Sequence, residues 1–152
     1  MHVGNYLQLL HSSEQQLIDA LRIVANHHGD EPDIFQTCQL VASWSQEVIA
    51  ALKPFLDRYG TEKNDEPERL TQILFAGTRT GSLALLRDLH DLWLLASEVK
   101  LTLSVLEQAA KALRDRELDA FCVEYGGQTK RQVDWLQHRI RQAAPQALVV
   151  AD

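Results

Sequence analysis

An apolar stripe between Gly81 and Leu113 is the feature that most constrains how this chain can fold. Its members recur at alternating intervals of four and three residues: Leu85, Leu89, Leu92, Ala96, Val99, Leu103, Leu106, Ala110 and Leu113. This spacing indicates an α-helix whose stripe lies along neighbouring helices. A second row on the same helix is also apolar: Leu94, Leu101, Val105 and Ala112. We therefore expect the helix to be covered on more than one side, with Glu98 as the acid that interrupts the second row.

Three further helices are predicted, at 5–28, 32–59 and 115–143, with Asp115 as the N-cap of the last. Short turns make the first and second helices, and the third and fourth, antiparallel neighbours. The connection at 60–81 holds a polar loop and then a short helix at 68–76. This connection is long enough to span the length of a long helix, so the second and third helices could run parallel. The sequence therefore predicts an all-α four-helix bundle with a short helix in the crossover.

Two features of the C-terminal part carry their own expectations. Gly126 and Gly127 lie inside the fourth helix, where glycine is unfavourable, so we expect a close helix contact, a bulge or a kink there. The apolar tail at 147–150 is expected to pack on the bundle or on a second subunit.

Length, composition and charge set limits on the class of protein. A chain of 152 residues fits a single domain, 1–152, with one core. A net charge of −6 without a basic block argues against nucleic acid and anionic membranes as partners. No apolar run is long enough to span a bilayer, and the first five residues lack the pattern of a secretory signal, so we expect a cytoplasmic protein. Cys38 and Cys122 are interpreted as core thiols in a reducing compartment, with a disulfide as the alternative.

Glu14 is the most informative polar residue, because it occupies a core position in the apolar series 7, 10, 14, 17, 21 and 24 of the first helix. A bundle core tolerates a carboxylate only if it is paired, hydrogen-bonded or bound to a metal. Glu98 is the second acid expected to enter the core, from the third helix. His11 lies one turn before Glu14 on nearly the same face. In ferritin-like di-metal bundles two helices each supply one Glu, and the other two each supply a Glu-x-x-His pair.

Three stretches of the chain carry a family resemblance: LHSSEQQL at 10–17, WSQEV at 44–48 followed by LKPF at 52–55, and VDWL at 133–136. Together they resemble small bacterial ferritin-like proteins of unknown function. The resemblance covers most of the chain in helix order and length. It implies a ferritin-like four-helix bundle, including a crossover between the second and third long helices.

The chain departs from that family's metal motif, because no Glu-x-x-His occurs in it. On the second helix only Glu47 could ligate a metal at the expected level. On the fourth helix Gln128, Arg131 and Gln132 stand where Glu and His would be looked for, and the Arg could pair with a remaining Glu. The di-metal motif is therefore degenerate.

Two functions follow as hypotheses. The first is a non-catalytic structural or interaction protein, homodimeric and without a cofactor, whose Glu14 and Glu98 bond to Tyr, Trp or Gln side chains. The second is an oxidoreductase or stress protein that binds iron or manganese through a reduced ligand set. That candidate metal set is His11, Glu14, Glu47 and Glu98. His27 and His28 are interpreted as caps at the end of the first helix. No phosphate-binding loop, Cys-x-x-Cys or nucleophile elbow is present, and the sequence names no small-molecule substrate.

Overall fold

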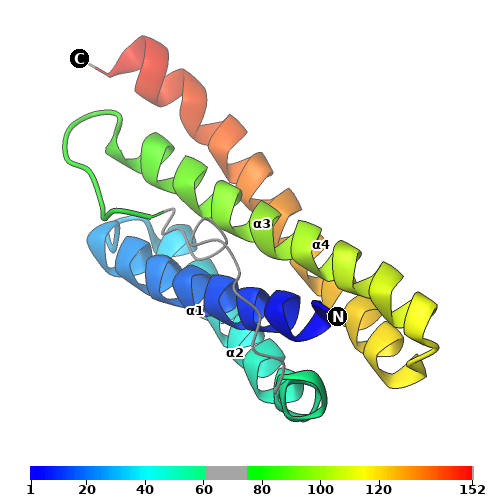
Figure 1. The fold of residues 1–152 in the computed structure, drawn as a ribbon. Helices are drawn as coiled ribbons and strands as arrows, with labels where there is room; N and C mark the ends of the chain where they lie inside the picture. Colours follow the sequence, from blue (N-terminus) through cyan, green and yellow to red (C-terminus); the bar gives the residue numbers. More distant parts are fainter. Residues whose placement is uncertain (61–74, 152) are drawn as a thin grey trace.

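The computed structural model describes residues 1–60 and 75–151, which form four long α-helices and a terminal π-helical segment (Figure 1). These elements are α1 Val3–His27, α2 Pro32–Tyr59, α3 Ala84–Leu113, α4 Arg116–Pro145 and η2 Gln146–Val150. The all-α four-helix prediction is confirmed. The helix predicted at 68–76 lies outside the described residues except for Phe75 and Ala76, which are not helical. Within the described ranges, no helix is long and apolar enough to cross a membrane.

Contacts at the two ends of the bundle fix the direction of each helix. At one end, His28 after α1 bonds Asp88 near the start of α3, and Arg139 near the end of α4 bonds Asp33 at the start of α2. At the other end, Tyr59 at the end of α2 bonds Asp115 before α4. α2 and α3 therefore run in the same direction, and α1 and α4 run in the opposite one. The end of α2 at Tyr59 and the start of α3 at Ala84 therefore lie at opposite ends of the bundle, which is the relationship that a crossover connection requires.

The core lies along the stripes that the helical spacing predicted. The largest fully buried side chains are Leu7, Leu10, Leu17, Ile18, Leu21, Ile34, Leu52, Leu89, Leu92, Leu95, Leu103 and Leu106. α3 packs mainly on α4 and α1, and α1 packs mainly on α2. Burial of one apolar face per helix, at about 25 cal/mol per Å² of apolar surface, is the main stabilising contribution in such a bundle.

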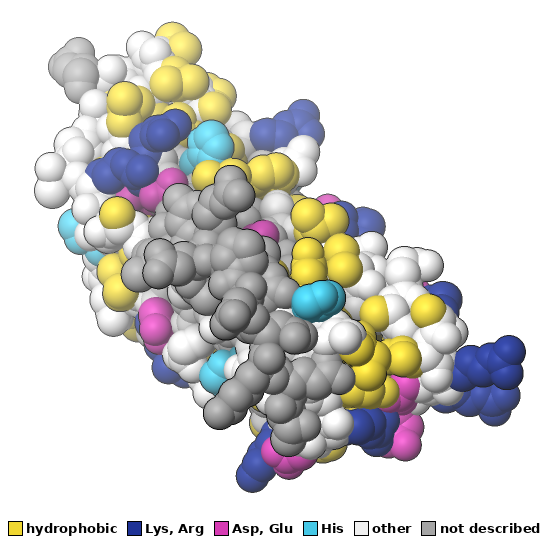
Figure 2. Space-filling view, in the orientation of Figure 1, with side chains coloured by type: hydrophobic (Ala, Val, Ile, Leu, Met, Phe, Trp, Pro, Cys, Tyr) yellow, Lys and Arg dark blue, Asp and Glu magenta, His cyan; other side chains and the backbone are white. Residues whose placement is uncertain are grey.

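The second apolar row of α3 is exposed, so the expectation that α3 is covered there is wrong within a single chain. Leu101 is 63% exposed, and Leu94, Val105 and Ala112 are exposed as well. The reason is geometric: α3 has two neighbouring helices, α1 and α4, and this row faces away from both. Figure 2 shows hydrophobic side chains gathered along the outer side of α3.

The C-terminal part also differs from expectation. α4 runs through Gly126 and Gly127 without interruption, and a Cβ atom at either glycine would meet nothing within 4 Å, so the predicted close helix contact is wrong. The close approach occurs instead at Gly4, where a Cβ atom would clash with the carbonyl oxygen of Tyr59. In the tail, Val149 is 81% exposed, so η2 does not bury its apolar side chains on the bundle. Packing on a second subunit remains a prediction.

Candidate functional sites

Glu14 enters the core, as its place in the α1 stripe predicted: its side chain is only 1% exposed. The hydroxyl of Ser45, on α2, hydrogen-bonds its carboxyl group. The side-chain amide of Gln132, on α4, donates from Nε2 to Ser45 Oγ at 3.4 Å and to the Val41 carbonyl oxygen at 3.3 Å. Glu14, Ser45 and Gln132 thus form a core polar layer that connects α1, α2 and α4.

The carboxyl group in this layer is neutral at neutral pH. Burial raises the pKa of Glu14 from 4.5 to about 8, and the hydrogen bond from Ser45 only partly opposes that rise. The groups that bond to it are a hydroxyl and, beyond that, an amide, so neither supplies a positive charge to hold the ionised form. Glu14 Oε2 and Gln132 Oε1 are buried without a hydrogen-bond partner in the described part of the chain.

The other three residues of the predicted metal set lie apart from this layer. Glu98 is half-buried on α3 and accepts a 3.3 Å hydrogen bond from Thr102 Oγ1, so the expectation that it enters the core is wrong. It belongs to the outward row of α3. Glu47 is exposed, because it follows Ser45 by two positions and therefore points to the other side of α2. His11 is half-buried.

No cluster of three metal-ligating side chains includes His11, Glu14, Glu47 or Glu98 among the residues that the structure describes. Arg131, which the sequence suggested as a partner for a remaining Glu, instead has its guanidinium carbon 5.9 Å from the ring centre of Trp44.

A different cluster, His27, His28 and Asp88, forms where the end of α1 meets the start of α3. One ligand atom from each residue lies within 4.8 Å of the others, and within the described ranges this is the only such group of His, Cys, Asp and Glu. Asp88 is fully buried, and His28 Nε2 donates to its Oδ2 at 2.8 Å. This carboxylate was not among the residues that the sequence singled out.

The crossover residue Arg79 completes this His–Asp cluster. Its backbone N–H donates to Asp88 Oδ1 at 3.1 Å, and its guanidinium Nη1 donates to the same oxygen at 3.2 Å. Nη1 also bonds Asp91 Oδ2 at 2.7 Å, and the Arg79 carbonyl oxygen accepts from His27 Nε2 at 2.9 Å. Both oxygens of the buried Asp88 carboxylate are therefore hydrogen-bonded, and one guanidinium is shared between Asp88 and Asp91, which is how a charge can be kept inside a protein.

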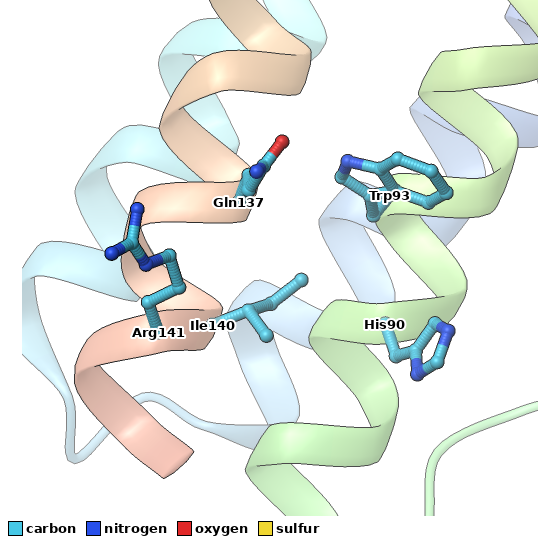
Figure 3. A pocket seen from close by; sticks show the side chains of 5 residues that line it. All are labelled: His90, Trp93, Gln137, Ile140 and Arg141. Atoms are coloured by element: carbon cyan, nitrogen blue, oxygen red, sulfur yellow. The ribbon is translucent and has the colours of Figure 1, made fainter.

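A surface pocket of about 300 Å³ lies between α3 and α4 (Figure 3). It is lined by His90, Trp93, Gln137, Ile140 and Arg141. Its volume is at the lower limit of small-molecule sites, and no carboxylate is among the described residues that line it.

The fold and these sites define an all-α four-helix-bundle protein with a neutral polar layer in its core. Comparison with protein families, curated proteins and solved structures yields no match to this chain.

Proposed function

We propose that this chain is a non-catalytic bundle protein that acts through its surface and whose core carries a degenerate form of the ferritin-like di-metal centre. The helix order supports the ferritin-like part of the proposal, because two antiparallel pairs joined by one long crossover are the arrangement of ferritin-like bundles. The observation that carries the non-catalytic part is the core polar layer. There Glu14 is joined by Ser45 and Gln132, whereas a di-metal bundle places carboxylates and imidazoles on these helices.

The donor set of this layer does not fit two divalent ions. Iron and manganese in such bundles require several anionic carboxylates together with imidazoles. Among the described residues Glu14 alone brings a carboxyl group to this layer. Its pKa is about 8, so it would have to lose a proton before it could ligate a metal. The hydroxyl of Ser45 and the amide of Gln132 are neutral and bring no charge to offset that of a cation.

The second candidate function, an iron- or manganese-binding oxidoreductase, has one observation in its favour. Glu14 Oε2 and Gln132 Oε1 are buried oxygen acceptors without a described partner, and such atoms suit either a water molecule or a cation. The test is the metal content of protein purified without chelator, and again after addition of Fe(II) or Mn(II), for the natural chain and for Glu14→Gln. Our proposal predicts no metal that depends on Glu14. Near-stoichiometric metal that disappears in Glu14→Gln would establish the oxidoreductase alternative.

The outward row of α3 supports the interaction role, and we propose that a second copy of this chain covers it. Leu94, Leu101 and Val105 are spaced by seven and four residues, which is the spacing of a seam between two packed helices. A row of this kind can meet its own copy about a two-fold axis, because the same patch then serves both subunits. Exposed apolar rows of this length are typical of interaction surfaces.

Sedimentation equilibrium tests this interface. We expect a dimer for the natural chain and a monomer for Leu101→Glu, since the introduced charges would face each other across the axis. Leu40→Glu is the matched control, because Leu40 is an exposed leucine on α2 outside the row. A natural chain that is monomeric throughout the concentration range, or a Leu101→Glu variant that stays dimeric, would contradict this interface.

A further inference from the structure

We propose that His27, His28 and Asp88 bind a divalent cation that prefers imidazole ligands, Zn²⁺ foremost, at the end of the bundle where the crossover enters α3. Two imidazoles and one carboxylate are a ligand set of zinc sites in which the protein supplies three ligands and leaves a fourth position open. The ligand atoms lie within 4.8 Å of one another, so any pair wider than about 3.3 Å must draw together when the ion binds. This site is separate from the core polar layer and goes beyond the proposed function.

The carboxylate of Asp88 is held in place before any ion binds. Its Oδ1 accepts from the backbone N–H and the guanidinium of Arg79, and its Oδ2 accepts from His28 Nε2 and, at 3.3 Å, from the same backbone N–H. Because Asp88 is fully buried and bonded on both oxygens, little conformational freedom is left to lose on binding. His28 is also buried, and its ring stands perpendicular to that of His27 with the ring centres 4.8 Å apart.

An ion would take the place of the proton between His28 and Asp88. In this structure His28 Nε2 and Asp88 Oδ2 are 2.8 Å apart. Zinc–ligand bonds of about 2.0–2.2 Å at a tetrahedral angle separate two ligand atoms by about 3.3 Å, so the pair must open by about half an ångström. The Nε2 atom of His28 must then present its lone pair to the ion, so the imidazole carries its one proton on Nδ1 in the bound form.

The charge balance of the site favours a cation. With both imidazoles neutral, Asp88 and Asp91 contribute two negative charges and Arg79 one positive charge, so one negative charge remains. Arg79 keeps its guanidinium between the two carboxylates. Asp88 is thereby oriented by Arg79 without being fully neutralised.

His27 gives the site its opening to solvent. Its side chain is exposed, whereas His28 and Asp88 are buried, so an ion can enter from the side of His27 and keep a water ligand there. The bond from His27 Nε2 to the Arg79 carbonyl oxygen matches the backbone partner that usually orients a metal-binding imidazole through its second nitrogen. Imidazole donors favour Zn²⁺ over Mg²⁺ and Ca²⁺, which select oxygen ligands.

Isothermal titration of the full chain, stripped with chelator and then freed of it, tests the site with ZnCl₂ and with MgCl₂. We expect one equivalent of Zn²⁺ to bind and Mg²⁺ not to compete. His27→Ala and His28→Gln should each weaken Zn²⁺ binding at least about tenfold, while His138→Ala, an exposed histidine of α4, should leave it unchanged. Circular dichroism of each variant verifies that it folds.

A second readout separates this site from the core. Imidazole ¹⁵N resonances of His27 and His28 should shift on addition of one equivalent of Zn²⁺, and Glu14→Gln should bind Zn²⁺ as the natural chain does. The proposal is overturned if the natural chain binds no Zn²⁺, if binding survives in both histidine variants, or if it is lost in Glu14→Gln. The last outcome would place the metal in the core and would also count against the proposed function, whereas the first two would leave that function standing.

Discussion

The side-chain amide of Gln132, on α4, lies 3.4 Å from the hydroxyl of Ser45, on α2, and that hydroxyl in turn bonds the carboxyl of Glu14, on α1. This link places three neutral polar groups from three helices in one layer of an otherwise apolar core. A buried network of this kind contributes to a unique alignment of the helices, because any shift of one helix would leave its polar groups unpaired.

Glu14 makes the stability of the fold depend on pH. Below its ordinary pKa of 4.5 the group is protonated in both states and contributes no pH dependence. Between 4.5 and about 8 the unfolded chain releases the proton while the folded chain keeps it, so the free energy of unfolding falls by about 1.4 kcal/mol per pH unit. Above about 8 the fall ends. Urea unfolding of the natural chain and Glu14→Gln across this range measures the difference.

Near pH 4 ionisation should contribute little to the difference in unfolding free energy between Glu14→Gln and the natural chain. By pH 7 we expect the variant to have gained about 3 kcal/mol relative to the natural chain, because the amide cannot ionise. The matched control is Glu47→Gln, an exposed acid of α2 that should show no such gain. A constant difference between Glu14→Gln and the natural chain from pH 4 to pH 8 would show that Glu14 is not held neutral by the fold.

The glycines of α4 and α1 should respond to alanine in opposite ways. Gly126→Ala and Gly127→Ala should each stabilise the protein by up to about 1 kcal/mol, since both positions are helical and a Cβ atom meets nothing there. Gly4→Ala should destabilise it, because its Cβ atom would clash with the Tyr59 carbonyl oxygen. Thermal unfolding measures all three. Destabilisation by Gly126→Ala would indicate a contact at α4, for example with a second subunit.

Asp115 is the N-cap that the sequence predicted, and its Oδ1 accepts from the backbone N–H of Leu118 at 3.0 Å. Asp115→Ala should lower the free energy of unfolding by about 1–2 kcal/mol, and Asp115→Asn, which retains the cap, by less.

Burial acts to raise the pKa of Asp115, but hydrogen bonds from Tyr59, Leu118 and Arg58 outweigh it and the net shift is downward. The stabilisation from this shift is therefore present above the ordinary pKa of 3.8 and is lost as pH falls through the lower folded value. Equal stability of Asp115→Ala and the natural chain would contradict the assignment.

Cys38 and Cys122 are free and buried, which confirms the prediction of core thiols. Burial raises the pKa of each thiol to about 12, and nearby acids add to the rise. Since the thiolate is the reactive form, we expect both to react with a thiol reagent at pH 8 only on the time scale of unfolding. Stopped-flow labelling with and without denaturant measures this. Rapid labelling of the folded chain would show that a thiol is accessible.

Local patterns in the sequence were sufficient to predict the helices, the burial of Glu14 and the cap at Asp115, because each depends on residues within a few turns. They were not sufficient for the outward row of α3, since an apolar row indicates a covered face without saying whether the cover comes from the same chain. The pair His28–Asp88 spans 60 residues and forms only because the crossover brings the start of α3 to the end of α1. The available sequence signal was the pair His27–His28 together with Asp88, an acid next to the core residue Leu89. Such a signal is weak.

The pKa of Glu14 itself tests the central claim most directly. It can be measured from the ¹³C shift of its side-chain carboxyl across a pH titration of the folded chain, with Glu14→Gln to assign the resonance. We predict a protonated carboxyl at pH 7 and a pKa of about 8. A carboxylate already ionised at pH 6 would contradict a neutral core layer, because it would require a cation beside Glu14.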